Sequence, residues 1–135
     1  MVETLQITVN QQGLHLITNQ IEQLVQQEKV NSGLCTLFIR HTSASLLIQE
    51  NADPSARHDL EAWLNRLVPE HDALYTHTME GADDMPAHIK CALTATSLSI
   101  PVINSSLALG VWQGIYLWEH RHAKAIRELV VHISE

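Results

Sequence analysis

The segment 75–90, YTHTMEGADDMPAHIK, gathers more groups capable of chemistry than any other part of the chain. Two histidines and three acids lie in it: His77, Glu80, Asp83, Asp84 and His88. Imidazole nitrogens bind zinc and neighbouring transition metals, whereas carboxylate oxygens suit Mg²⁺. We therefore predict a site for a divalent metal, zinc or magnesium, in which histidines and acids also serve as catalytic groups.

A third histidine, His41, follows the apolar run 34–40. Side chains alternate between the two faces of a strand. If the inward-pointing residues of this run are every second one, His41 lies on the inner side at the end of the strand. Together with His77 and His88 it would supply three imidazole ligands and leave one position open for water or substrate. The spacing matches no zinc signature such as HExxH, so the three histidines could equally be hydrogen-bonded groups that hold a long loop.

The acids and the lysine of the segment have alternative roles. Asp83 and Asp84 precede a helix that we expect to begin at Pro86; either could be its N-cap, and Asp84 is the expected one. Either aspartate could instead bind Mg²⁺, and the first turn of the helix could receive a phosphate with Lys90 nearby. Glu80 is a candidate general base, or a solvated loop residue.

Glu119 ends an apolar strand face in the run 111–121. A buried carboxylate needs a partner, so Glu119 either pairs with a base such as Arg121 or lines a cleft. Large aromatic residues favour a core or a subunit interface, and three share the other face: Trp112, Tyr116 and Trp118.

These groups must be positioned by strands with helices inserted between them. Alternating or apolar runs predict strands at 5–9, 14–18, 34–40, 45–49, 98–103, 107–109, 111–119 and 126–133. The first two strands are expected to form a hairpin, and Thr18 to cap a helix. Asp53 and Pro54 begin a second helix, and the third follows Asp84. Short turns between strands predict an antiparallel α+β fold, a sheet or sandwich with two to three helices in one domain, 1–135.

Composition excludes several classes of function. The net charge of −7 argues against nucleic-acid binding, which needs clustered basic residues. No apolar run is long enough to span a membrane, and the first residues lack an export signal, so we expect a cytoplasmic protein. Cys35 and Cys91 lie in apolar contexts and are expected to be free buried thiols.

Three long motifs resemble the YjbQ family, also described as the secondary thiamine-phosphate synthase family: HTSASLLIQENADPSARHDL, YTHTMEGADDMPAHIK and GVWQGIYLWEHR. The resemblance runs nearly end to end. It implies a β-rich α+β fold, a homotrimer, no organic cofactor and a small phosphorylated metabolite as ligand. It also implies a weak thiamine-phosphate synthase activity, which joins a pyrimidine diphosphate to a thiazole phosphate and releases pyrophosphate. Two alternatives stay open: a metal-dependent hydrolase that uses a His-bound water, and a non-catalytic trimer that binds a small anionic metabolite.

The resemblance also selects residues in each motif. Catalytic roles fall on His41, His77, Glu80, His88 and Glu119. Substrate binding falls on Ser43, Asn51, Asp83, Asp84, Lys90, Gln113 and Arg121. The chain departs from the family pattern at Asn104-Ser105-Ser106, where a glycine with a nearby basic residue is usual, and at Val111, where threonine is usual. If the basic residue contacts a phosphate, this chain binds its anionic substrate less well.

Overall fold

Strands with alternating apolar and polar residues make up most of the chain. The computed structural model describes residues 1–135. The elements in order are β1 (Val2–Val9), β2 (Gly13–Leu16), α1 (Thr18–Glu28), β3 (Ser32–Ile39), β4 (Ala44–Glu50), α2 (Pro54–Leu67), α3 (Asp84–Leu93), β5 (Ser97–Ile103), β6 (Ser106–Leu107), β7 (Gln113–Glu119) and β8 (Ala125–Ser134). The predicted antiparallel α+β fold in a single domain with three helices is confirmed.

The strands form two antiparallel sheets. One has five strands in the order β1-β8-β3-β5-β6, and the other has three in the order β2-β7-β4. A cluster of 20 buried apolar residues draws on both sheets and on α1. In β3, Cys35 and Leu37 are fully buried and Ile39 is 1% exposed, so the predicted inward face of this strand is confirmed. Both cysteines are free and buried, as expected.

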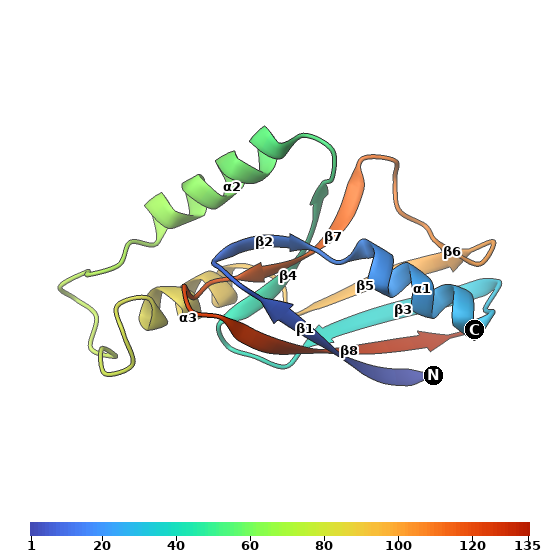
Figure 1. Cartoon of the computed structure of the whole chain (residues 1–135), viewed down its shortest axis with the longest axis horizontal. Helices are drawn as coiled ribbons and strands as arrows, with labels where there is room; N and C mark the ends of the chain where they lie inside the picture. Colours follow the sequence, from blue (N-terminus) through green and yellow to red (C-terminus); the bar gives the residue numbers. More distant parts are fainter.

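Helix α2 covers the other face of the three-stranded sheet (Figure 1). Leu64 and Val68 pack there with Leu14, Tyr116 and Trp118 in a second, smaller apolar cluster. Strand β7 is therefore buried on both faces, since Gly114–Glu119 contains no exposed residue. Tyr116 and Trp118 lie in the core, one of the two predicted places for the aromatic face. Trp112 precedes β7 and is 63% exposed in the single chain, so it is not part of the core.

The predicted opening hairpin is wrong. Strand β1 pairs with β8, in the register Val2↔His132 to Val9↔Ala125. Strand β2 pairs with β7 in the other sheet, starting at Gly13↔Glu119. The chain changes sheets at Gly13, whose φ of 127° belongs to a region that glycine adopts easily. The turn therefore joins two sheets instead of two neighbouring strands.

Thr18 does not cap α1. The helix has Ile17 at its N-cap, and no side chain caps it. The hydroxyl of Thr18 instead accepts a hydrogen bond from the backbone N–H of Ile115 at 2.9 Å. Pairing between β2 and β7 ends at Leu16↔Tyr116, so this buried N–H has no strand partner and the hydroxyl satisfies it.

Helix α2 begins as predicted. Asp53 accepts a hydrogen bond from the backbone N–H of Ser55, and Pro54 occupies the first helical turn. Between α2 and α3 a long loop extends away from both sheets (Figure 1). No helix in the structure combines the length and apolar character needed to cross a membrane.

Candidate metal centre

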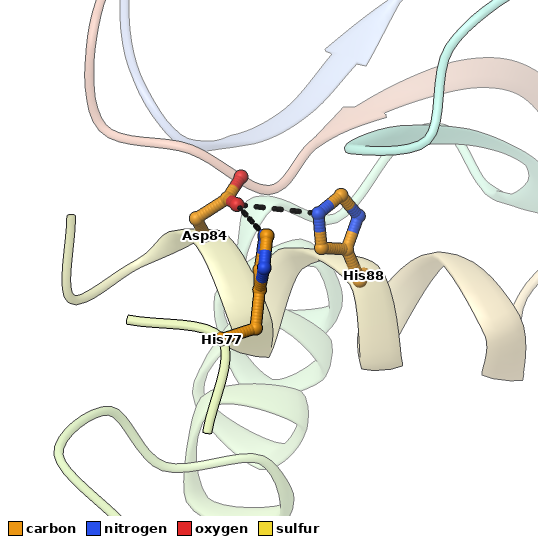
Figure 2. A group of neighbouring side chains, drawn as sticks. All are labelled: His77, Asp84 and His88. Carbon is orange, nitrogen blue, oxygen red and sulfur yellow. Dashed lines mark hydrogen bonds and ion pairs between the residues drawn. The ribbon is translucent and has the colours of Figure 1, made fainter. Parts of the chain in front are cut away.

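His77, Asp84 and His88 meet at the start of α3 (Figure 2). One ligand atom from each lies within 4.8 Å of the other two. The Oδ2 atom of Asp84 is 2.7 Å from Nε2 of His77 and 3.2 Å from Nε2 of His88. Ligands at about 2.1 Å from a tetrahedral zinc ion lie roughly 3.4 Å apart, so the His88–Asp84 distance is close to that of a coordination edge. The shorter His77–Asp84 distance is that of a hydrogen bond.

Helix α3 and the preceding loop bring the three residues together. Asp84 and His88 are four residues apart in the helix, and this spacing places both side chains on one face. The loop that follows α2 returns to place His77 over the same face, with its ring centroid 5.3 Å from that of His88. The site therefore needs only one helix turn and one loop crossing.

The expected N-cap role of Asp84 is wrong. Asp83 occupies the N-cap, without a side-chain capping bond, and Asp84 is the first residue of α3. The helix also begins two residues before Pro86, the expected start. The side chain of Asp84 is only 4% exposed, and its second oxygen, Oδ1, is 3.0 Å from Nη1 of Arg121. Its carboxylate thus faces an arginine and two histidines instead of the helix backbone.

The proton positions around His88 leave room for a cation. Nδ1 of His88 is 3.0 Å from the carbonyl oxygen of Thr42, which can only accept, so Nδ1 carries a proton. In neutral His88, Nε2 is then unprotonated and lies 3.2 Å from the carboxylate of Asp84. Two acceptors at this distance repel unless His88 is an imidazolium or a cation lies between them. A metal-binding histidine commonly donates its other N–H to a carbonyl, as His88 does here.

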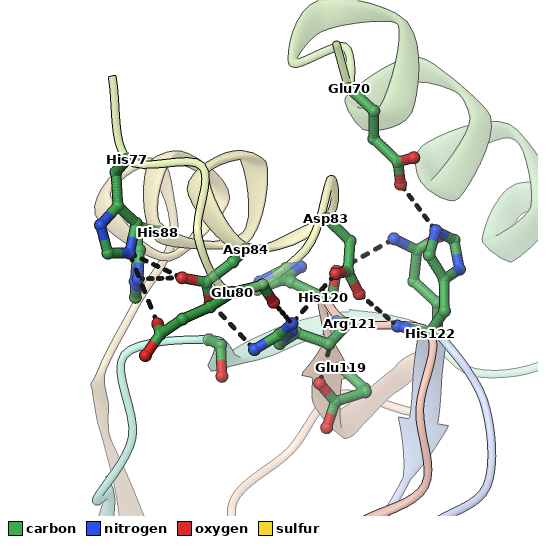
Figure 3. Close-up of polar contacts among 12 residues, drawn as sticks. Glu70, His77, Glu80, Asp83, Asp84, His88, Glu119, His120, Arg121 and His122 are labelled. Carbon is green, nitrogen blue, oxygen red and sulfur yellow. Dashed lines mark hydrogen bonds and ion pairs between the residues drawn. The ribbon is translucent and has the colours of Figure 1, made fainter. Parts of the chain in front are cut away.

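Charged neighbours keep the acids of α3 ionised. Burial raises the pKa of Asp84, but the hydrogen bond from His77, the Glu80 side chain, the charge of His88 when it is an imidazolium and the charge of Arg121 outweigh it, and the net pKa is lowered. The same balance holds for Asp83, where the backbone N–H of His122 and the Arg121 guanidinium outweigh burial and lower the pKa. Arg121 thereby links both aspartates (Figure 3).

Glu80 stands at the open side of the centre. Its Oε2 is 3.6 Å from Nε2 of His77, and its side chain is 65% exposed. The backbone carbonyl of Glu80 accepts a hydrogen bond from Arg121 at 2.6 Å. Its carboxylate thus contacts the centre from the solvent side.

His41 is not in the cluster. Its Nε2 accepts a hydrogen bond from the backbone N–H of Glu128 at 2.8 Å, so this nitrogen is already occupied. Burial and the charge of Arg127 lower the pKa of His41. His41 and His88 nevertheless line the same cavity of about 340 Å³. The structure thus places Asp84, and not His41, beside the other two histidines, and His41 at the wall of an adjoining cavity.

Glu119 is paired with a base, but with Arg127 in place of the expected Arg121. Both oxygens of Glu119 are 2.6 Å from nitrogens of Arg127, and Glu119 is fully buried. Arg121 contributes only its backbone N–H, at 3.0 Å. Arg127 also donates to the hydroxyl of Ser43 at 3.0 Å. Glu119 and Ser43 therefore belong to a buried network that supports the β3–β4 turn.

Asn51 and Gln113 lie at the far end of the same strand pair. Asn51 donates to the backbone carbonyls of Val111 and Gln113, and the Gln113 side chain accepts from Gly110. In the β4–β7 ladder Glu50 faces Gln113, whereas Ala44 faces Glu119. At about 3.4 Å per residue, this separates the two ends by roughly 20 Å. Asn51 and Gln113 hold a loop there, away from the metal centre.

The sites of departure from the family pattern lie outside the centre. Asn104 and Ser105 have φ angles of 51° and 64° in the turn between β5 and β6, a conformation that favours glycine. Val111 is 78% exposed beside Asn51. Lys90 is also separate from the cluster, because its ammonium contacts Asn65 of α2 at 2.6 Å.

Comparison with known proteins identifies the family. A family model described as "UPF0047 protein YjbQ-like" matches residues 3–135. The chain belongs to the YjbQ family. It is 52% identical to a UPF0047 protein of Synechocystis over 132 residues, which are 98% of this chain and 90% of the relative. It is 45% identical to YjbQ of Escherichia coli O157:H7, over 95% of this chain and 93% of that protein.

Solved structures of similar proteins have the same fold. A conserved hypothetical protein from Thermus thermophilus is 32% identical, with a TM-score of 0.87, over 98% of this chain and 99% of that one. An uncharacterized protein of the YjbQ/UPF0047 family from Clostridium acetobutylicum is 34% identical, with a TM-score of 0.86, over 99% of each chain. The expected family and fold are therefore both confirmed.

Two buried residues of this YjbQ-family chain escaped the sequence analysis. Arg127 stands on the inward face of β8, in alternation with Leu129 and Val131, so strand periodicity was a signal that could have found it. His120 follows Glu119 and is 1% exposed, with its Nε2 2.8 Å from the hydroxyl of Ser45. No local pattern distinguishes His120 from the exposed histidines of the chain.

Proposed function

We propose that the chain is a metal-assisted transferase that acts on a small phosphorylated metabolite at the His77–Asp84–His88 centre. The observation that carries the proposal is the convergence of His77, Asp84 and His88, in which Nδ1 of His88 bonds the Thr42 carbonyl while Nε2 lies 3.2 Å from the Asp84 carboxylate. Two imidazoles and one carboxylate are a donor set used for divalent transition metals, and the set leaves coordination positions open. The donor chemistry and the spacing of the three residues fit such an ion.

The reaction that we propose is the thiamine-phosphate synthase reaction implied by the family resemblance. A divalent ion at this centre would neutralise the charge that develops on a leaving diphosphate. Arg121 adds a fixed positive charge beside Asp84, which keeps this carboxylate ionised and oriented. The carbocation-like carbon of the pyrimidine needs little help from a protein nucleophile, so positioning and electrostatics can carry the step.

Individual residues take defined parts in this proposal. His77, Asp84 and His88 hold the ion, and Thr42 fixes the tautomer of His88 through its carbonyl. Glu80, whose side chain is 65% exposed, would place its negative charge near the carbocation-like carbon of the pyrimidine. The thiazole nitrogen carries no proton, so this step needs no base. The cavity of about 340 Å³ that His88 shares with His41 offers space for the substrate rings next to the centre.

A metal-dependent hydrolase is the second candidate, and the donor set favours it. Two histidines and a carboxylate also occur in centres that activate water for hydrolysis. The hydrolase would split a phosphorylated substrate without any second organic substrate. The third candidate is a non-catalytic protein that binds a small anionic metabolite at the same centre.

The first test is the metal content of untagged protein purified without added metal. Wild type, His88→Ala and the control His58→Ala are compared, because the side chain of His58 is 81% exposed and outside the cluster. A near-stoichiometric transition metal in wild type and in His58→Ala, but not in His88→Ala, supports the centre. Metal retained in His88→Ala, or absent from all three even after incubation with zinc or magnesium, would sink the proposal.

The second test separates the three functions. Metal-loaded protein is incubated with the pyrimidine diphosphate, with and without the thiazole phosphate, and both thiamine phosphate and released phosphates are measured. Thiamine phosphate formed only with both substrates supports the transferase. Phosphate release without the thiazole supports the hydrolase. Thermal stabilisation by the substrates without turnover supports the binding protein.

We also propose that the chain forms a homotrimer in the cytoplasm. Apolar side chains surround a cavity of about 290 Å³ between α2 and the three-stranded sheet. Trp63, Leu67 and Leu93 line it and are more than half exposed. Apolar surface of this kind is typical of protein interfaces. The two free cysteines suit a reducing compartment.

A further inference from the structure

One ring nitrogen of His41 has a proton to donate and no acceptor in the chain. The backbone N–H of Glu128 donates to Nε2 of His41 at 2.8 Å. A nitrogen that accepts such a bond carries no proton, so the proton of the ring lies on Nδ1. Nδ1 lies 3.5 Å from Nη1 of Arg127 and has no other partner in the chain. Because a guanidinium nitrogen can only donate, the Nδ1–H group meets a second donor instead of an acceptor.

Arg127 has the same deficit at one of its three nitrogens. Nε and Nη2 donate to the two oxygens of Glu119, and Nη2 also donates to the hydroxyl of Ser43. Nη1 contacts only Nδ1 of His41. Arg127 is 8% exposed, and buried N–H groups are nearly always paired. Two residues therefore present N–H groups side by side, and neither group finds an acceptor in the fold.

These donors adjoin a cavity that a ligand can enter. The cavity has a volume of about 340 Å³ and is lined by His41, Thr42, His88, Cys91, Ala92 and Thr96. This volume lies at the lower end of the range for small-molecule sites. Thr42 and Thr96 carry hydroxyl groups, which can donate as well. A ligand in the cavity can therefore supply the acceptor that the chain lacks.

A phosphate oxygen fits the two donor nitrogens. Guanidinium and imidazole N–H groups form strong hydrogen bonds to charged oxygens. Nitrogens 3.5 Å apart can share one oxygen that lies about 2.9 Å from each of them. A phosphate monoester then has two further terminal oxygens for the hydroxyl groups of Thr42 and Thr96, whereas a carboxylate has only one. The donor set of the cavity is thus better matched by phosphate.

The acids closest to the two donors are already paired. Glu119 accepts from Nε and Nη2 of Arg127, which leaves Nη1 to a ligand. Glu128 pairs with Arg40 at 3.3 Å. No unpaired carboxylate of this group would repel an anion, but the arginines add no excess positive charge either. Hydrogen bonds, and not net charge, would therefore hold the phosphate.

We propose that Nδ1 of His41 and Nη1 of Arg127 bind the phosphate group of a ligand in this cavity. The identity of the ligand rests on the proposed transferase function: the phosphate of the thiazole substrate lies at the two donors. The diphosphate of the pyrimidine lies at the metal centre, which shares His88 with the cavity. No bond forms or breaks at the thiazole phosphate, so His41 and Arg127 bind and orient this substrate and transfer no proton.

Metal-free protein separates this subsite from the metal centre. Protein labelled with ¹⁵N is dialysed free of metal with a chelator and titrated with sodium phosphate at pH 7 and constant ionic strength. NMR correlations between the ring nitrogens and ring C–H protons show which nitrogen of His41 carries the proton. We expect a proton on Nδ1, and an Nδ1 resonance that shifts with phosphate until it saturates. Sodium chloride and sodium acetate serve as comparison salts and should cause no such shift.

The same titration gives the phosphate affinity through the backbone amides of Thr42 and Thr96. His41→Phe keeps a ring but removes the donor, so phosphate should bind at least about tenfold more weakly. His132→Phe is the matched control, because His132 is exposed on β8, and its phosphate affinity should equal that of wild type. Thermal unfolding checks that both variants fold. If His41→Phe is unfolded, the resonance of His41 in wild type decides the question alone.

Three results would overturn the subsite: a proton on Nε2 of His41, a His41 resonance that phosphate leaves unchanged, or equal phosphate affinity in wild type and folded His41→Phe. An equal response to acetate would overturn the assignment to phosphate. Failure of the metal centre gives a different result. Phosphate bound at His41 in a protein that takes up no metal would uphold the subsite and remove the metal-assisted reaction, whereas metal bound without phosphate at His41 would do the reverse.

Discussion

Glu119 and Arg127 form a two-point ion pair in the interior of the fold. Oε1 and Oε2 of Glu119 each lie 2.6 Å from a guanidinium nitrogen of Arg127. Glu119 is fully buried and Arg127 is 8% exposed. Arg127 also donates to Ser43 and approaches Nδ1 of His41 at 3.5 Å. This pair therefore ties β7 and β8 to the turn that supplies His41 to the cavity beside the candidate metal centre.

Breaking this pair from one side leaves an uncompensated buried charge. We expect Glu119→Gln to lower the free energy of unfolding by about 3 to 5 kcal/mol. The measurement is urea denaturation of wild type and variant at pH 7. The neighbouring surface pair Arg40–Glu128, whose side chains are 57% and 41% exposed, provides the control. Glu128→Gln should cost less than about 1 kcal/mol, and an equal loss in both variants would contradict a special role for the buried pair.

Strand periodicity predicted most of the fold. Alternation identified the inward face of β3 because this strand buries one side in the core. The prediction of an opening hairpin was wrong because a turn signal at Gly13 reports only local geometry. The strands that pair with β1 and β2 are β8 and β7, which are distant in sequence. The sequence pattern predicts which face of a strand is buried, but not which sheet the strand joins.

The candidate site was predicted in part. His77 and His88 were grouped correctly, because a polar, titratable segment beside a helix start is unusual in a small domain. Asp84 was expected to cap the helix, since that role is common for an acid at this position. In the fold Asp84 contacts Arg121, which lies 37 residues further along the chain, in the loop between β7 and β8. Long-range pairing of this kind has no local signal.

The two adjacent aspartates allow a matched test of the metal centre. Asp84 faces the two histidines, whereas Asp83 contacts Arg121 and the backbone of His122. We expect Asp84→Asn to weaken zinc binding by tenfold or more, which is the order of effect that losing a ligand contact has. Asp83→Asn should leave the zinc affinity nearly unchanged. Isothermal titration calorimetry at constant pH measures both affinities. Equal affinities in the two variants would remove Asp84 from the ligand set.

His120 makes stability depend on pH. Burial, with the charges of Lys90 and Arg127, lowers the pKa of His120 from 6.5 to about 3. The unfolded chain therefore binds a proton that the folded chain rejects, and the contribution of His120 to stability is complete above about pH 6.5 and falls as the pH drops toward 3. The slope is about 1.4 kcal/mol per pH unit within this window.

The test compares unfolding free energies of wild type and His120→Gln between pH 7 and pH 4, in the presence of a chelator. The pKa of His41 is also lowered and acts in the same direction, so the difference between the two proteins isolates His120. His120→Gln should lose less stability than wild type on acidification. The exposed His58→Gln should follow wild type, and parallel curves for all three proteins would contradict a neutral buried His120.

The apolar cavity between α2 and the three-stranded sheet is the surface that we expect to bury in the trimer. Trp63 and Leu67 lie on α2, and each is 53% exposed at this cavity. A carboxylate introduced at Trp63 would lose its hydration in an interface core without gaining a partner. Trp63→Glu should therefore shift the protein from a trimer toward a monomer of 15.1 kDa, as measured by sedimentation equilibrium.

Leu74→Glu is the control, because Leu74 is 87% exposed and does not line the cavity. A wild-type protein that sediments as a monomer, or a Trp63→Glu variant that remains a trimer, would exclude this surface as the interface.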